Sequence, residues 1–344
     1  MTPIYNQLLI PFLTAMVVAI TMGGSGTAPA FSASYGANVM RKSLIPGLFG
    51  IMVFVGAFLA GKKTAGTMGS GILPAEYMDF TVVSIALFSI AVTMLISNIS
   101  GIPQSTSQAA VLALAAPALY FGRLDTHNLF IEIIPAWFIL PIISYFLSFF
   151  AGKYIYQPMR RRGLTIQRAQ NENKRHIWDI VLVIMALYVS FAIGSNNVAN
   201  AAGPLYTMTI NELHIRESDH IVILMLATLV VAPCFGIGAS LFGHKILKNT
   251  GKEIILFGKF EAVIIAFISG SLLLLASVVK GIPTSLVQVN VAAILGIGVA
   301  KMGHKNIFRK TQVKRFFTMW MIAPVISFLL SLLLIFLADK ANLL

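Results

Sequence analysis

Acidic residues are scarce in this chain of 344 residues, with 12 Asp and Glu against 25 Lys and Arg and a formal net charge of +13. Charged residues of both signs make up only 11% of the sequence, whereas soluble domains contain about 25%. Together with a hydrophobic share of 57%, this shortage excludes an ordinary soluble domain and predicts an integral membrane protein with several helices. A single cysteine, Cys234, excludes an intramolecular disulfide, and its apolar neighbours indicate a buried structural residue.

The excess of positive charge does not indicate a nucleic-acid partner. Lys and Arg gather in short segments between apolar runs, as in the cytoplasmic loops of membrane proteins. The densest of these segments, residues 152–176, contains the run Arg160-Arg161-Arg162, which we expect to touch acidic lipids. No cleavable signal is expected, because the first 22 residues lack a basic start. The lipid bilayer of the cell membrane is therefore the expected partner of these residues, and we expect no nucleic acid.

Catalytic motifs are also lacking. The sequence contains no nucleophile elbow, no Walker loop and no His-Glu metal helix. The six histidines all fall in expected loops, and no two have metal-ligand spacing within a span; they are His127, His176, His214, His220, His244 and His304. The sequence thus argues against an enzyme or a membrane sensor, and it indicates no metal site beyond a possible site for Na⁺.

Apolar segments fall into two sets of five, which predicts an all-α polytopic membrane protein. The first set is 4–22, 44–60, 78–98, 103–121 and 129–151, and the second set is 177–193, 221–242, 262–279, 284–300 and 316–338. A Gly-rich, weakly apolar stretch follows the first segment of each set, at 23–40 and 194–210.

Four short patterns recur in the same order in both sets. Residues 23–30 pair with 194–201, 56–63 with 238–245, 101–108 with 281–288, and 137–144 with 320–327. The nearly constant offset predicts a duplication, with a first repeat at 1–151, a connector at 152–176 and a second repeat at 177–344.

The loop charges predict that the two repeats are inverted. The connector and the basic loops 243–260 and 301–315 should be cytoplasmic, and the acidic loop 211–220 should be outside. Each half then has about five membrane elements, and such an odd number gives the inverted repeats common in transporters. The segment 61–77 fits less well, because it should be outside and yet carries Lys62 and Lys63. Some Gly-rich pieces are therefore candidates for re-entrant rather than spanning elements.

Three asparagines, Asn196, Asn197 and Asn200, lie between glycines in the otherwise apolar stretch 192–204. An amide without a partner in a bilayer costs several kcal/mol. The stretch therefore predicts a broken backbone that lines a polar site. The alternative is that these amides join helices through hydrogen bonds.

The paired segments 101–108 and 281–288 both begin with Gly-Ile-Pro. Gly-x-Pro breaks a helix and suits the start of the next one, which Ser105 or Thr106 would cap in the first copy. A helix N-terminus with added hydroxyls binds an anion without Lys or Arg, although the hydroxyls of a merely kinked helix would cap their own backbone. Two such motifs at equivalent places predict an oxyanion pocket.

These motifs resemble those of the inorganic phosphate transporter (PiT) family. Residues 194–201 are similar to the family's Gly-Ala-Asn-Asp-Val-Ala-Asn-Ala signature, and residues 101–108 are similar to its Gly-x-Pro-x-Ser-Thr-Thr-His/Gln element. The resemblance covers essentially the whole chain. It implies a secondary active transporter with inverted repeats, often a homodimer, which moves a tetrahedral oxyanion together with Na⁺ or H⁺ and has no other cofactor.

Departures from the family pattern bear on the anion. The aspartate of the signature is Asn197 here and Gly26 in the first copy, and the glutamates of the preceding spans are Leu87 and Phe267. The Gly-Gly-Ser-Gly-Thr-Ala form of the first copy resembles the CysP-like sulfate-permease branch. Sulfate is fully deprotonated and needs only donors, whereas phosphate keeps protons near pH 7 and benefits from a carboxylate. We therefore predict import of sulfate or thiosulfate, with phosphate symport as the alternative and an uncoupled anion channel as a further one.

The predicted site lies between the two Gly-Ile-Pro motifs, flanked by the Gly-rich stretches. Its predicted substrate-binding residues are Ser25, Gly26, Ser105, Thr106, Ser107, Gln108, Asn196, Asn197, Thr284, Ser285 and Gln288. For the coupling ion, Asn196 and Asn200 with backbone carbonyls would hold Na⁺. Lys280 would serve as a tethered cation or else extend to the membrane surface. Proton coupling would have to use Asp179 or Glu261, the acids near the spans.

Overall fold

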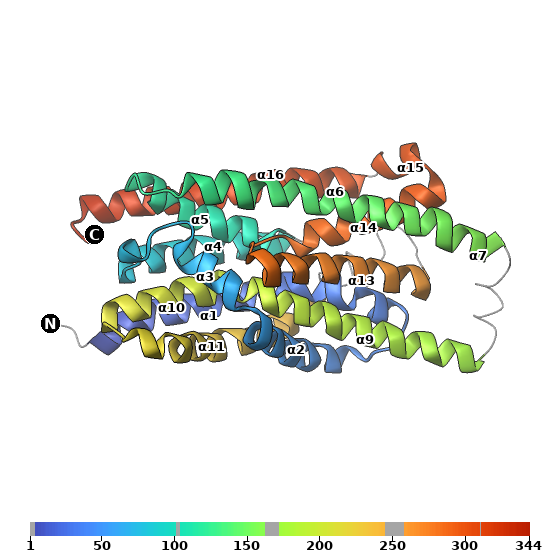
Figure 1. The fold of residues 1–344 in the computed structure, drawn as a ribbon, viewed down its shortest axis with the longest axis horizontal. Helices are drawn as coiled ribbons and strands as arrows, with labels where there is room; N and C mark the ends of the chain where they lie inside the picture. Colours follow the sequence, from blue (N-terminus) through green and yellow to red (C-terminus); the bar gives the residue numbers. More distant parts are fainter. Residues whose placement is uncertain (1–3, 101–103, 162–171, 245–257, 310) are drawn as a thin grey trace.

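The computed structural model describes residues 4–100, 104–161, 172–244, 258–309 and 311–344. Four predicted features fall outside these residues in part: Gly101, Ile102 and Pro103 of the first motif, residues 162–171 of the connector, residues 245–257 of one basic loop, and Lys310 of the basic loop 301–315. The described residues form helices that run along one long axis, joined by short connections (Figure 1).

The elements follow one another in two groups along the chain. The first group is α1 (Ile4–Gly36), η1 (Lys42–Leu44), α2 (Ile45–Ala60), α3 (Lys62–Ser70), η2 (Ala75–Tyr77), α4 (Phe80–Ser100), α5 (Thr106–Tyr120), η3 (Asn128–Ile133), α6 (Ile134–Phe150), η4 (Ala151–Tyr156) and α7 (Gln157–Arg161). The second group is α9 (Glu172–Asn197), α10 (Ala199–Leu213), η5 (Glu217–Asp219), α11 (His220–Leu241), α13 (Lys259–Leu275), η6 (Ala276–Lys280), α14 (Leu286–Met302), α15 (His304–Phe308) and α16 (Thr311–Lys340).

Eight helical stretches among the described residues are long and apolar enough to cross a membrane, so the chain is a multi-pass membrane protein. They are Leu8–Gly36, Lys42–Ala60, Phe80–Ser100, Asn128–Arg161, Ile177–Leu213, Glu217–Leu241, Lys259–Lys280 and Trp320–Lys340. The apolar helices α5 and α14 are shorter, with 15 and 17 residues. At 1.5 Å per residue they reach about 22 and 26 Å, less than the roughly 30 Å of a hydrocarbon core.

The short helices α5 and α14 belong to two helical hairpins. In the α4–α5 hairpin, Arg123 Nε donates to Tyr77 Oη at 3.0 Å, so the start of α4 lies beside the end of α5. In the α13–α14 hairpin, Lys301 Nζ lies 2.6 Å from Glu261 Oε1, so the start of α13 lies beside the end of α14. Each hairpin thus returns to the end of the molecule from which it starts.

The two hairpins open toward opposite ends of the molecule. Tyr120, at the end of α5, donates to Asp339 at the end of α16, at 2.6 Å. The end of α14 leads through α15 to the opposite end of α16. Hairpins of opposite orientation are what inverted repeats would contain, and the duplication itself stays a prediction. The start of α1 lies at the end of the molecule where α5 and α16 finish (Figure 1).

The first Gly-rich stretch does not break its helix, since α1 continues through residues 23–36. The second is interrupted at one residue, because α9 ends at Asn197 and α10 begins at Ala199. The break predicted for 192–204 is therefore limited to Val198, which keeps helical backbone angles of −61° and −34°. The glycines instead permit close helix contacts, because a Cβ on Gly194 would lie 2.0 Å from the Val53 carbonyl oxygen, and one on Gly23 would lie 2.2 Å from that of Phe235. Longer breaks occur at the bends of the two hairpins.

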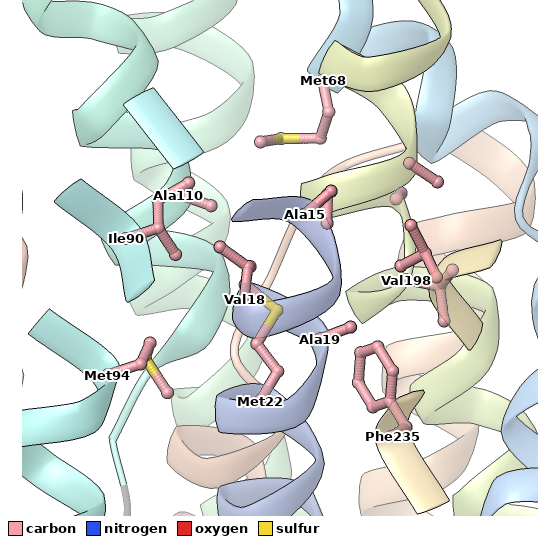
Figure 2. Close-up of a cluster of buried hydrophobic side chains, with 14 of the residues drawn as sticks. Ala15, Val18, Ala19, Met22, Met68, Ile90, Met94, Ala110, Val198 and Phe235 are labelled. Atoms are coloured by element: carbon pink, nitrogen blue, oxygen red, sulfur yellow. The ribbon is translucent and has the colours of Figure 1, made fainter. Parts of the chain in front are cut away.

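Helix α1 lies in the middle of the main hydrophobic core. Figure 2 shows Val18 and Met22 of α1 on the side facing Ile90 and Met94 of α4, with Phe235 of α11 across from them. Cys234 belongs to this core, which confirms that it is buried as predicted. The buried polar side chains described next lie outside this apolar core, near the bends of the two hairpins.

Candidate functional site

Two serines cap the short helices of the hairpins. Ser105 Oγ accepts from the backbone N–H of Gln108 at 3.4 Å, and Ser285 Oγ accepts from that of Gln288 at 3.3 Å. The predicted cap at α5 is confirmed, and the second motif has the same cap. Because these hydroxyls accept from their own helix, the neighbouring hydroxyls are the ones that bond across to other helices.

The asparagine stretch lies against the N-terminus of α5. Asn197 Nδ2 donates to Thr106 Oγ1 at 3.0 Å, and Asn200 Nδ2 donates to Ser107 Oγ at 3.1 Å. Ser107 Oγ in turn donates to Asn196 Oδ1 at 3.3 Å. All five side chains are buried. The structure thus brings together two motifs that are about 90 residues apart in the sequence.

Asn196 extends this cluster to the bend of the second hairpin. Its Nδ2 donates to Ser277 Oγ at 2.8 Å and to the carbonyl oxygen of Ile282 at 2.9 Å. Its Oδ1 accepts from the backbone N–H of Thr284 at 3.1 Å. One amide therefore joins the start of α5 to the segment between η6 and α14.

Gln108 and Gln288 form a reciprocal amide pair where α5 and α14 meet. Gln108 Nε2 donates to Gln288 Oε1 at 3.1 Å, and Gln288 Nε2 donates to Gln108 Oε1 at 2.9 Å. Both side chains are 6% exposed. The pair links equivalent positions of the two Gly-Ile-Pro motifs, so each glutamine orients the other.

Several buried polar atoms of this cluster have no hydrogen-bond partner among the described residues. They are Asn197 Oδ1, Asn200 Oδ1 and Thr284 Oγ1, with Asn98 Oδ1 and Gln104 Nε2 close by in the chain to the first motif. A buried polar atom left unpaired costs about 1–3 kcal/mol. Carbonyl oxygens suit a hard cation, and a hydroxyl or an amide N–H suits an anion. The cluster therefore offers free groups for ligands of both signs.

Carboxylates take no part in the cluster. In the part of the chain that the structure describes, its hydrogen bonds join amides, hydroxyls and backbone groups, and no group of three His, Cys, Asp or Glu that could hold a metal ion is found there. The groups that this cluster offers to a charged ligand are therefore neutral dipoles and helix N-termini.

Two predicted residues of the first Gly-rich stretch are not hydrogen-bonded to this cluster. Ser25 Oγ donates to the Met22 carbonyl oxygen of its own helix at 3.0 Å. A Cβ on Gly26 would lie 3.2 Å from the Phe49 ring, against an apolar neighbour. Substrate contact by Ser25 and Gly26 stays a prediction that this arrangement does not support directly.

The charged residues considered for coupling pair with one another or with Glu132 in the part of the chain that the structure describes, and not with the amides of the cluster. The Lys280 side chain is 61% exposed and lies 3.3 Å from Glu132 Oε1. Asp179 pairs with Lys259, and Glu261 pairs with Lys301. Glu261 precedes Ser277 by 16 residues of α13 and η6, which is about 24 Å along the axis.

Other polar residues at the hairpin bends were not predicted. Ser277 accepts from Asn196, Ser97 donates to Gln104, and Trp137 Nε1 donates to the Pro283 carbonyl oxygen at 3.0 Å. A signal for the serines was present, because the offset of 180 residues that links Gly101 to Gly281 also links Ser97 to Ser277. The two serines thus occupy equivalent positions just before each break.

Comparison with known proteins gives consistent matches over most of the chain. Residues 22–331 match the model of the phosphate transporter family. The chain is 31% identical over 337 residues to the sulfate permease CysP of Bacillus subtilis (strain 168), covering 97% of this chain and 89% of the permease. Its fold matches a solved structure titled the sodium-dependent phosphate transporter, with a TM-score of 0.81, 19% identity, and coverage of 97% of this chain and 99% of the other.

Proposed function

The chain belongs to the phosphate transporter family, and from this premise we propose that it is a secondary active transporter that imports a tetrahedral oxyanion, with sulfate as the main substrate. Thiosulfate, a sulfate analogue, would be a further substrate. The similar proteins named above are a permease and a transporter rather than enzymes. Family membership does not determine which anion is carried or which ion drives its uptake.

One observation carries the proposal of sulfate. The buried cluster at the N-termini of α5 and α14 consists of amides, hydroxyls and backbone N–H groups, and Asn197 stands in it without a carboxylate beside it. Sulfate carries no proton to donate, so a site made of donors suits it and a carboxylate would repel it. The similarity to a protein named as a sulfate permease supports the same substrate.

The anion would lie between the two caps, reached by donors from both hairpins. Thr106, Ser107 and Thr284 would supply hydroxyls, and Ser105 and Ser285 would hold the helix starts in place. Gln108 and Gln288 would keep the two helix starts in register through their paired amides. Movement of one hairpin relative to the other would open the cluster to each side of the membrane in turn.

Sodium is the coupling ion that the buried groups suit better. Asn197 Oδ1 and Asn200 Oδ1 are buried acceptors without a partner among the described residues, and neutral carbonyl oxygens are ligands for a hard cation. The fold of a protein titled as sodium-dependent agrees with this choice. Proton coupling through Glu261 or Asp179 would require transfer across about 24 Å from groups already paired with lysines.

Phosphate symport is the alternative, supported by the name of the family and by the phosphate transporter that shares the fold. Labelled sulfate and phosphate uptake into proteoliposomes, with Na⁺ and pH gradients set independently, distinguishes the two. We expect saturable sulfate uptake that an inward Na⁺ gradient accelerates and that thiosulfate inhibits. Inhibition by phosphate far stronger than by sulfate or thiosulfate would overturn the choice of substrate.

An uncoupled anion channel on the same fold is a further alternative. Counterflow exchange of sulfate marks a transporter, whereas a large uncoupled current would mark a channel. We further propose that the protein lies in the cell membrane as a homodimer, with the segment 152–176 in the cytoplasm. Its basic residues would then face the cytoplasmic leaflet.

A further inference from the structure

Three lysines lie together on the surface where the second hairpin bends. Lys62 and Lys63 begin α3, and Lys280 ends η6. Lys63 Nζ donates to the Val279 carbonyl oxygen at 3.1 Å, and a Cβ on Gly281 would lie 2.8 Å from the Lys63 carbonyl oxygen. The start of α3 and the bend are therefore in direct contact.

These lysines lie where two spanning helices end, because Lys42–Ala60 ends just before Lys62 and Lys259–Lys280 ends at Lys280. Figure 1 shows α3 and the end of α13 near the middle of the long axis along which the spanning helices run. All three lysines are nevertheless exposed, and Glu132 is the carboxylate that pairs with Lys280. A lysine at the centre of a bilayer costs about 2.5–3.5 kcal/mol, and such residues almost always face water or protein. The lysines therefore require water at this depth.

The lysines lie close to residues of the candidate site, both along the chain and around a shared cavity. Ile282, two residues after Lys280, accepts a hydrogen bond from Asn196. Lys62 lines a cavity of about 160 Å³ that Val198 and Ala199, at the junction of α9 and α10, also line. These two residues directly follow Asn197 and precede Asn200 of the asparagine cluster.

We propose that Lys62, Lys63 and Lys280 line a water-filled entrance that collects the anion before it reaches the buried cluster. The entrance carries three positive charges against the one negative charge of Glu132, so its field raises the local concentration of a divalent anion. The entrance faces the outside in the topology predicted from the loop charges. This proposal rests on the proposed function, since it assumes that an inorganic oxyanion is carried.

Cysteine substitution tests the entrance directly. In a Cys234→Ala parent, Lys62→Cys and Lys280→Cys are treated in intact cells with charged, membrane-impermeant methanethiosulfonates, and modification is read by mass. Phe138→Cys is the matched control, because this exposed α6 residue lies near Glu132 along the chain and has no proposed contact with water. We expect the cysteines at positions 62 and 280 to react and the one at position 138 to remain unmodified.

Sulfate uptake at low ionic strength then tests the role of charge. We expect each Lys→Cys variant to raise the KM for sulfate about threefold. A reagent that adds a positive charge should restore the KM, and one that adds a negative charge should raise it further. Lys62→Arg, which keeps the charge, should transport like the parent. If the positively charged reagent restores the KM of a Lys→Cys variant, that variant is folded, and its raised KM comes from the missing charge.

Three results would overturn the entrance. If the cysteines at positions 62 and 280 do not react with the charged reagents, these positions face lipid. If they form disulfides between two copies of the protein, they lie in a dimer interface. Equal effects of the positive and negative reagents would remove the role of charge. A parent protein without any sulfate uptake would instead contradict the proposed function, so the two failures are distinguishable.

Discussion

Asn197 is the residue on which the choice of anion depends most. The resemblance places an aspartate there, and the structure shows a 4% exposed amide that donates to Thr106 and leaves Oδ1 without a partner among the described residues. In Asn197→Asp, a buried negative charge would lie beside the site and repel a divalent anion. We expect sulfate uptake to fall by at least about tenfold, an effect of about 1.4 kcal/mol, with phosphate gaining as a competitor.

The control for this change is Asn38→Asp, which adds the same charge at an exposed residue with a φ of 55°. Its sulfate uptake should equal that of the unmodified protein. Uptake measured side by side in proteoliposomes checks both variants. Unchanged sulfate kinetics in Asn197→Asp would mean that the anion binds away from this amide.

Gln108 and Gln288 depend on each other for their hydrogen bonds. In Gln108→Leu or Gln288→Leu, the remaining amide is left buried and unpaired, which costs about 1–3 kcal/mol. In the double variant no unpaired amide remains, so its loss of stability should be smaller than the sum of the single losses. Thermal unfolding of the four proteins in detergent gives the coupling. Additive losses would show that the two amides act independently.

At the scale of elements, the bend of the second hairpin depends on one glycine. Gly281 has a φ of 67°, where a side chain costs about 1–2 kcal/mol, and it also lies against the Lys63 backbone. Gly122 has a φ of 65° with nothing within 4 Å of an added Cβ. Gly281→Ala should therefore lower the melting temperature more than Gly122→Ala, and it alone should reduce sulfate uptake, because it shifts the bend. Equal losses of melting temperature and of uptake in the two variants would mean that backbone strain alone, and not the contact with Lys63, causes the effect.

The elements show which local signals could be interpreted without a structure. Ser105 caps α5 as expected, because a cap is a contact within one turn. Pro283, expected at the start of the next helix, instead precedes the Ser285 cap of α14. The asparagine stretch interrupts its helix at Val198 alone, and its glycine Gly194 lies within α9. In a tightly packed membrane bundle a glycine removes a side chain from a helix crossing, as Gly194 does beside Val53. Sequence alone does not distinguish this use of glycine from a helix break.

At the scale of the whole molecule, long-range pairings could not be predicted. Lys63 meets Val279, 216 residues away, and Asn196 meets both hairpins. The periodicity of apolar residues indicates that a segment crosses a membrane, but it does not indicate which polar faces meet. The charge of the loops, by contrast, sums over many residues and so supports a prediction for the entire chain.

The topology is the last prediction, and it concerns the whole molecule. The start of α1 and the end of α16 lie at one end of the bundle, and the start of α13 with Lys259 and the end of α7 with Arg160 and Arg161 lie at the other (Figure 1). Because basic loops stay in the cytoplasm, epitope tags at either terminus should bind antibody on intact cells, whereas a tag within 162–171 should bind only after permeabilisation. A protected C-terminal tag would reverse the orientation, and the lysine entrance would then open to the cytoplasm and could not collect an imported anion.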